Sequence, residues 1–260
     1  SRVKSIRNKF RVTDIDKFLN VNKSDIHDGM LLKNMDRGLT LLNKVLTENE
    51  NPRIFVKVDS DVDGFTSSSY IMQFINEVSN HKANITFKIS QDKTHGIVAR
   101  YDIGDNKYDL IIIPDAGSEN VEDCRVISEK GIPILILDHH IFNYSEINDY
   151  AVLINCTDGS YPNPTLSGVG VVHKFCVEYC KKYGLSEQLA NNYLDLVAFG
   201  MIADSMDMRN YETRYYTLEG LKPENHKNLF LNELYKRSEN ELKFGRTIQN
   251  HQTICRLYKP

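Results

Sequence analysis

Blocks of apolar and polar positions alternate along this chain, and they predict strands and helices in turn. Short runs rich in β-branched and apolar residues have the length of strands at 53–58, 83–89, 108–114, 132–138 and 150–155. Helical periodicity is found at 24–48, 66–78, 120–130, 167–182, 187–201 and 213–235. Several strands are apolar throughout, which is typical of a parallel sheet covered on both faces. We predict an α/β fold: a parallel sheet flanked by helices, with helical extensions at both ends.

The same pattern divides the 260 residues into three predicted parts. Residues 1–50 form an N-terminal helical extension, 51–221 the α/β domain, and 222–260 a helical linker or tail. With 41% hydrophobic residues, the chain can build one large domain, or one domain plus an appendage.

Charge and composition place the chain among ordinary globular proteins. The net charge of −3 does not by itself indicate nucleic-acid binding, but the first eleven residues carry five Lys or Arg and no acid. From 214 to 260, nine Lys or Arg stand against five Glu, an excess of 9 − 5 = +4. Basic ends around an acidic middle suit a polyanion track beside a metal site. Without a membrane-length apolar run or a signal peptide, and with an odd number of cysteines (five), a cytoplasmic location is expected.

The segment VKVDSDVDGFTSSS, residues 56–69, places Asp59, Asp61 and Asp63 at alternate positions directly after a predicted strand. Asp and Ser at such a place are also common helix caps. A calcium-binding EF-hand is excluded, because position twelve counted from Asp59 is Tyr70 rather than Glu, and a strand rather than a helix precedes the motif. Three carboxylates this close repel one another unless a cation lies between them.

Two further predicted strands end in similar side chains. Asp115 follows the strand at 108–114, and Asp138, His139 and His140 end the strand at 132–138. The carboxyl ends of parallel strands lie along one edge of a sheet, so these groups are expected to converge there. Carboxylates with one or two histidines favour manganese or magnesium over structural zinc. The sequence therefore predicts a metal centre at this edge.

Four motifs, DSDVDGFTS, PDAGS, LDHH and GMIADSMDM, stand in the order of the motifs of the DHH phosphoesterases, and the chain most resembles the RecJ-like single-strand exonucleases. The segments NPTLSGVGVVHKF and NYETRYYTLEGL support this resemblance, which covers about 53–221 well. It implies that two divalent cations, manganese first and magnesium as the alternative, hydrolyse a phosphate ester.

The resemblance also implies residue roles. Asp61 would bind one ion and Asp63 the other, with Asp115 bridging them. His139 and Asp204 would complete the second ion's ligands, and His140 would face the scissile phosphate. Asp59 would fill the place of a histidine that some relatives carry where this chain has Lys57.

The residues themselves support several of these roles. An unpaired charge would be costly at Asp204, which lies in the apolar run VAFGMIADSM. We expect Asp138 to orient its neighbours in catalysis. The candidate substrate contacts are His95, Gly168, Gly170, Arg214 and Arg256. The structural alternative is tight packing for the glycines and solvated surface for the arginines.

These observations predict a metal-dependent phosphodiesterase, a 5′→3′ exonuclease on single-stranded DNA. A phosphodiesterase of short oligonucleotides or dinucleotides, and a non-catalytic nucleic-acid or partner-binding module on the same fold, remain the alternatives. In RecJ-like proteins a second domain with a glycine-rich, histidine-containing motif completes the strand-binding cleft. No such motif occurs in these 260 residues, so a second domain or a protein partner is expected to complete the groove.

Overall fold

The structure is a computed structural model that describes residues 12–90, 95–144 and 148–243. A five-stranded, all-parallel sheet forms its centre, with strand order β2-β1-β3-β4-β5. The strands are β1 (Arg53–Val58), β2 (Asn84–Ile89), β3 (Leu110–Pro114), β4 (Ile134–Asp138) and β5 (Val152–Asn155). The predicted parallel sheet and its five strands are confirmed.

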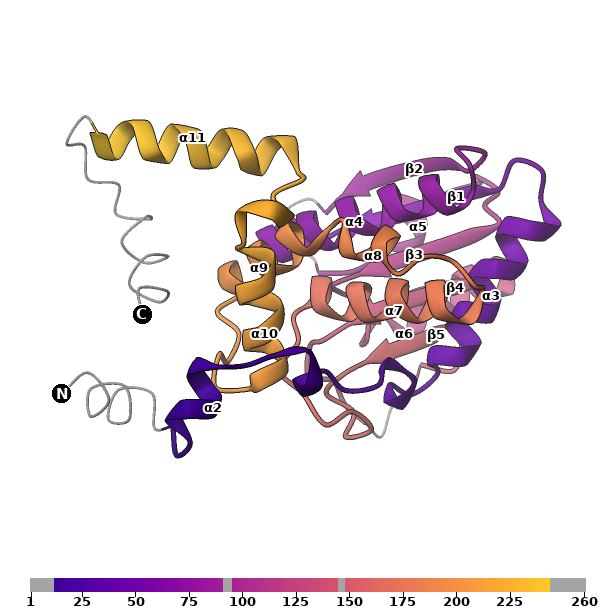
Figure 1. Ribbon diagram of the computed structural model, residues 1–260. Helices are drawn as coiled ribbons and strands as arrows, with labels where there is room; N and C mark the ends of the chain where they lie inside the picture. Colours follow the sequence, from indigo (N-terminus) through magenta and orange to yellow (C-terminus); the bar gives the residue numbers. More distant parts are fainter. Residues whose placement is uncertain (1–11, 91–94, 145–147, 244–260) are drawn as a thin grey trace.

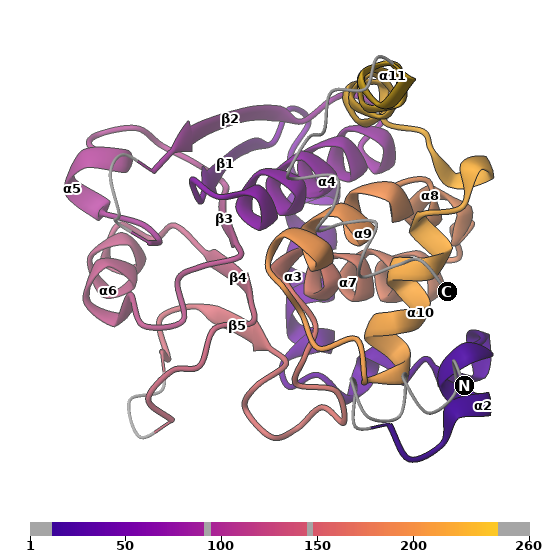
Figure 2. The same cartoon turned by 90° about the vertical axis from the view of Figure 1, so that its left-hand side faces the viewer.

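Helices cover both faces of this sheet (Figures 1 and 2). One face carries α3 (Met35–Glu48), α4 (Val62–Val78), α7 (Gly168–Lys182) and α9 (Leu194–Ala203), and the other carries α5 (Ala99–Asp102) and α6 (Val121–Glu129). The remaining elements are α2 (Ile15–Leu19), η1 (Lys23–Asp25), η2 (Gly29–Leu31), α8 (Gln188–Asn191), α10 (Tyr211–Gly220), η3 (Pro223–Asn225) and α11 (Leu229–Lys243). No helix among the described residues is both long and apolar enough to cross a membrane.

Two apolar cores result from the alternation of side chains along each strand. On β1, Ile54 and Val56 lie in the larger core with α3, α4 and α7, whereas Phe55 lies in the smaller core with α6. Strands β3 and β4 are buried along their whole length, which explains their continuous apolar sequence. The apolar side chains of α3 belong to the larger core, so this helix packs as part of the α/β layer structure. The three-part division of the chain stays a prediction.

Three expected helices are interrupted in the structure. The segment 24–48 forms two short 3-10 turns before α3, because Asn34, directly before α3, adopts a left-handed conformation with φ 64°. The segment 187–201 is split into α8 and α9. The helix expected from Thr213 to about Tyr235 ends at Gly220, and a turn that starts with Pro223 precedes α11.

Helix α11 starts where a buried carboxylate holds the chain. Asp195 Oδ2 accepts the backbone N–H groups of Lys227 (2.8 Å) and Asn228 (2.6 Å), just before the helix begins. Helix α11 continues to Lys243, beyond the end expected from the sequence, and extends away from the sheet (Figure 1).

The strand order places a topological switch point between β1 and β3. From β1 the chain crosses to β2 on one side, and it later continues with β3 on the other side of β1. Ligands of open α/β sheets bind beyond the carboxyl ends of the strands at such a point. The aspartates that follow β1 and β3 therefore lie at this switch point.

Candidate metal centre

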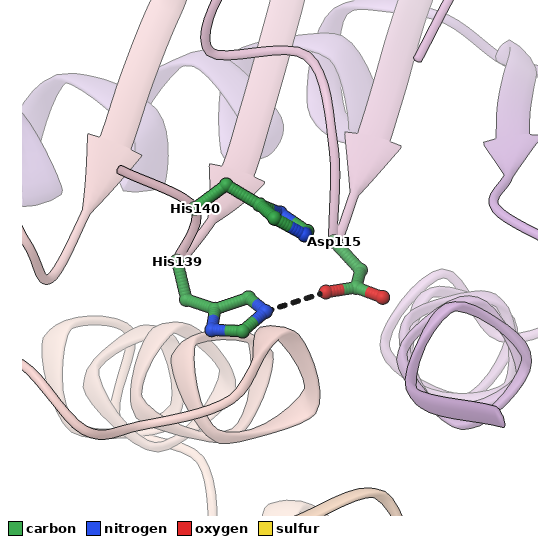
Figure 3. A group of neighbouring side chains, drawn as sticks. All are labelled: Asp115, His139 and His140. Carbon is green, nitrogen blue, oxygen red and sulfur yellow. Dashed lines mark ion pairs between the residues drawn. The ribbon is translucent and has the colours of Figure 1, made fainter. Parts of the chain in front are cut away.

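Side chains from the carboxyl ends of β1, β3 and β4 converge beyond the sheet, as the sequence predicts. Figure 3 shows Asp115 and His139 facing one another across this edge, with His140 beside them. Three overlapping groups of Asp and His side chains place one ligand atom each within 4.8 Å of one another. They are Asp59–Asp61–Asp115, Asp63–His139–Asp204 and Asp115–His139–His140.

The first motif turns from strand to helix between Val58 and Val62. Asp61 is the N-cap of α4, and its Oδ1 accepts the N–H of Gly64 at 2.8 Å. Asp61 therefore caps the helix and also belongs to the group Asp59–Asp61–Asp115. Asp59 is 2% exposed, and its backbone lies against Gly64, where a Cβ would be 2.6 Å from the Asp59 carbonyl oxygen.

Asp63 is held by the N-terminus of α7. Its Oδ2 accepts the N–H of Gly168 at 2.6 Å, and its Oδ1 accepts the N–H of Val169 at 3.2 Å. The N-terminus of a helix carries free N–H groups and a partial positive charge, so it orients a carboxylate well. Burial nevertheless raises the pKa of Asp63, against the lowering effect of His139 and the Val169 N–H.

Asp115 lies at the centre of the site in a conformation that non-glycine residues seldom adopt, with φ 62°. It is 1% exposed, and neither carboxylate oxygen accepts a hydrogen bond. Burial raises its pKa well above the usual value, and the charges of Asp63, Asp138 and Asp61 raise it further. A buried carboxylate that accepts no hydrogen bond and lies beside like charges is costly unless a cation binds it.

His139 contacts three carboxylates through Nε2. The distances are 3.2 Å to Asp115 Oδ1, 3.5 Å to Asp204 Oδ2 and 3.8 Å to Asp63 Oδ2. Asp204 is the C-cap of α9, so its carboxylate comes from the end of a helix rather than from the helix interior. Burial raises its pKa, His139 lowers it, and Asp61 raises it.

This donor set fits two divalent cations. Oxygen-rich groups with one imidazole suit manganese and magnesium. Three carboxylate oxygens of this cluster are buried without a hydrogen-bond partner: both of Asp115 and Oδ1 of Asp59. Asp115 lies between the Asp59–Asp61 side and the His139 side, which suits the bridging position.

Asp138 and His140 form a second unit beside the cluster. Asp138 Oδ1 lies 2.8 Å from His140 Nδ1 and also accepts the N–H of His139 at 2.7 Å. Burial would raise the pKa of Asp138, but the hydrogen bond and charge of His140, with Ser118, lower it to about 2. The hydrogen bond to Asp138 raises the pKa of His140 to about 9 against the effect of burial. At neutral pH the imidazole is thus protonated, and its Nε2–H is free of the Asp138 contact.

Sequence reasoning missed two residues that fix this unit. Ser118 donates its Oγ–H (2.6 Å) and its N–H (3.1 Å) to Asp138 Oδ2. Asn155, at the end of β5, donates from Nδ2 to Ser118 Oγ and to the His140 carbonyl, both at 2.9 Å. Ser118 lies in the quoted segment PDAGS, which was a usable signal, whereas Asn155 is brought in only by the pairing of β4 with β5.

The predicted substrate contacts lie in different environments. His95 joins the site, with Nδ1 2.8 Å from Asp59 Oδ2 and its ring centroid 6.1 Å from that of His140. The Gly168 N–H is bound to Asp63, and Gly170 packs against Met201. Arg214 donates Nε–H to the Phe18 carbonyl at 2.7 Å and lies over the Phe18 ring, which joins α10 to α2.

Arg256 lies outside the described residues, as do 1–11 and the rest of 244–260 at the two basic chain ends. The substrate roles of all five residues stay predictions. Lys57 points away from the metal centre, because its Nζ lies 3.0 Å from Asp102 Oδ2 on the α5 side of the sheet.

Comparison with known proteins agrees with this site. The DHH family, N-terminal domain, matches residues 53–201, which include all the metal-centre residues except Asp204. The chain belongs to the DHH family.

Its relatives include single-strand-specific nucleases. Over 242 residues the chain is 39% identical to the Bacillus subtilis strain 168 protein named "Putative SPbeta prophage-derived single-strand DNA-specific exonuclease YorK", covering 93% of this chain and 40% of that protein. It is 29% identical over 235 residues to the single-stranded-DNA-specific exonuclease RecJ of the same organism, covering 86% of this chain and 28% of RecJ. The chain thus spans less than half the length of these curated relatives.

The fold is that of solved RecJ structures. A crystal structure of exonuclease RecJ bound to manganese superposes with a TM-score of 0.63 at 23% identity, covering 73% of this chain and 48% of that one. The likeness confirms the parallel sheet with flanking helices as the architecture of the RecJ DHH domain.

Proposed function

We propose that this chain is a metal-dependent phosphodiesterase that acts as a 5′→3′ exonuclease on single-stranded DNA. One observation carries the proposal: two adjoining Asp and His groups meet at Asp115, a buried carboxylate that accepts no hydrogen bond. The names of the relatives, single-strand DNA-specific exonucleases, support the substrate class. The manganese in the superposed RecJ structure supports manganese as the metal, with magnesium as the alternative.

The residues divide into two sets of ligands. Asp59, Asp61 and Asp115 would hold one cation. Asp63, His139 and Asp204 would hold the other, with Asp115 shared between the two. When bound, two such cations activate the water that attacks phosphorus and neutralise the charge that develops on the phosphate.

The protein's own residues supply positioning and a proton. The N–H groups of Gly168 and Val169 fix Asp63, and the backbone N–H of His139 helps to fix Asp138. His140, oriented by Asp138 and protonated because its pKa is raised to about 9, would donate Nε2–H to a non-bridging phosphate oxygen or to the leaving oxygen. Asp138 keeps its charge and stabilises that imidazolium.

A cleavage assay tests the proposal. Single-stranded DNA and RNA labelled at the 5′ or the 3′ end, and a dinucleotide, are incubated with the protein and manganese or magnesium, with and without a chelator. We expect metal-dependent release of nucleotides from the 5′ end of DNA. Preferred hydrolysis of the dinucleotide would instead identify a short-substrate phosphodiesterase, and binding of DNA without cleavage would identify a non-catalytic module.

A further inference from the structure

Asp59 is held in two different ways, one acting on its backbone and one on its side chain. The backbone packs against Gly64 in the first turn of α4, so closely that any side chain at Gly64 would collide with it. The side chain has one fixed oxygen, Oδ2, which lies 2.8 Å from His95 Nδ1. The other oxygen, Oδ1, is buried and has no hydrogen-bond partner.

The hydrogen bond between them has a defined direction. A carboxylate that binds a cation is ionised and can only accept, so in that state His95 Nδ1 would be the donor to Asp59 Oδ2. This contact sets the rotation of the Asp59 carboxylate about its Cβ–Cγ bond. Burial alone would not fix that rotation. Oδ1 is then the oxygen left for a ligand on the side shared with Asp61 and Asp115.

The backbone around His95 is itself anchored. Ile97 donates its N–H to Asn120 Oδ1 at 3.0 Å, at the start of α6. Gly96 adopts φ 86° and lies so close to Asn120 that a Cβ would meet its Oδ1 at 1.8 Å. These contacts hold the backbone next to His95 against the start of α6, on the face of the sheet that carries α5 and α6.

The His95 side chain is 64% exposed, so little packing accounts for its position. Its ring lies beside that of His140, and its hydrogen bond to Asp59 orients Nδ1. It therefore orients Asp59, as the α7 N-terminus orients Asp63, but His95 holds only Oδ2 of Asp59, whereas α7 contacts both oxygens of Asp63.

We propose that His95 is a positioning residue for the metal centre, which fixes Asp59 as a ligand of the cation shared with Asp61 and Asp115. The inference rests on the proposed two-cation function. The His95–Asp59 pair would then serve the metal centre. Lys57 cannot, because its side chain is paired with Asp102 on the α5 side of the sheet.

Manganese binding tests the proposal directly, without a catalytic readout. Free manganese is followed by electron paramagnetic resonance during titration of wild type, His95→Ala, His95→Asn and His81→Asn. His81 is an exposed histidine outside the site and serves as the matched control. We expect His95→Ala to weaken one of two manganese sites by about 10–100-fold and to leave the other unchanged. His95→Asn keeps a donor near the Nδ1 position and should bind close to wild type, as should His81→Asn.

Single-stranded DNA hydrolysis supplies the second readout. High manganese should restore the rate of His95→Ala, because the defect is in ligand geometry. Unchanged binding of both ions by His95→Ala, or a rate defect that manganese does not rescue, would overturn the positioning role. Two normal sites and normal cleavage in that variant would leave the proposed function intact. A wild-type protein that binds no manganese would instead overturn the proposed function itself.

Discussion

The carboxylate of Asp115 lies directly against the Cα of Gly168, the first residue of α7. A Cβ at Gly168 would lie 2.3 Å from Asp115 Oδ1 and 2.5 Å from its Cβ. The absence of a side chain at Gly168 thus allows the N-terminus of α7 to reach both Asp63 and Asp115. A residue that the sequence suggested as a phosphate contact is, in the structure, a contact of the metal-centre carboxylates.

Gly168→Ala should therefore displace Asp115 or the start of α7. We expect loss of manganese affinity and of activity, with a decrease in the free energy of unfolding of about 1–3 kcal/mol from overpacking. Gly170→Ala is the matched control, because its Cβ would meet Met201 Cε at 2.7 Å and Leu166 Cβ at 3.2 Å rather than a metal-centre carboxylate. Calorimetry with manganese and thermal unfolding compare the two. Equal effects of both variants would contradict the special role of Gly168.

Asp115→Asn should abolish metal-dependent hydrolysis and raise the stability of the metal-free protein. Burial and three neighbouring carboxylates raise the pKa of Asp115, so its ionised form destabilises the fold when no cation is bound. A raised pKa contributes stability that is complete below the unfolded value of 3.8 and is lost as pH rises through the folded value. The metal-free wild type should thus melt at lower temperature as pH rises from 4 toward neutral, with a shallower decrease in Asp115→Asn. Thermal unfolding at a series of pH values with a chelator checks this.

The two neighbouring histidines should fail in different ways. His139→Ala removes an imidazole that lies 3.2 to 3.8 Å from three carboxylates, so metal affinity should fall and excess manganese should partly restore the rate. His140→Ala should lower the rate by about 10²–10⁴-fold with little change in metal dependence. Rates measured across a manganese titration separate the two, and equal rescue of both would contradict the assignment.

The pH dependence of the rate should report on the Asp138–His140 pair. The pKa of His140 is raised to about 9, so the protonated donor is present at neutral pH and is lost as pH rises through about 9. Asp138→Asn removes the carboxylate that causes this rise, so the alkaline limb should move toward the ordinary histidine value of 6.5. A profile of kcat against pH at saturating manganese measures the shift. An alkaline limb at the same pH in both proteins would rule out His140 as the proton donor.

Lys57→Met should leave the metal centre unchanged, although Lys57 stands four residues before Asp61. Its ion pair with Asp102 lies on the α5 side of the sheet, and Lys88 also contacts Asp102 at 3.1 Å. Breaking a buried ion pair typically costs about 3–5 kcal/mol, and the remaining Lys88 should keep the loss below that range. Urea unfolding measures the loss, and manganese titration should match wild type. Weaker manganese binding would place Lys57 in the site after all.

The strands and the candidate metal ligands could be predicted from the amino-acid pattern. The apolar runs at β1, β3 and β4 specify buried parallel strands, and the order of strands and helices restricts the topology to a doubly covered sheet. Because parallel strands all end at the same edge, Asp59, Asp115 and His139 could be expected there from sequence alone.

Which atoms meet in the site depends on the packing of distant segments. Local patterns do not encode close approaches between distant segments, such as Gly168 against Asp115 or His95 beside Asp59, because these depend on how α7 and the chain after β2 pack against the sheet. Local patterns also do not predict the left-handed conformation of Asn34, directly before the start of α3. The sequence supplied the donors of the metal centre, and the packing of the helices on the sheet fixed which oxygens are left for a cation.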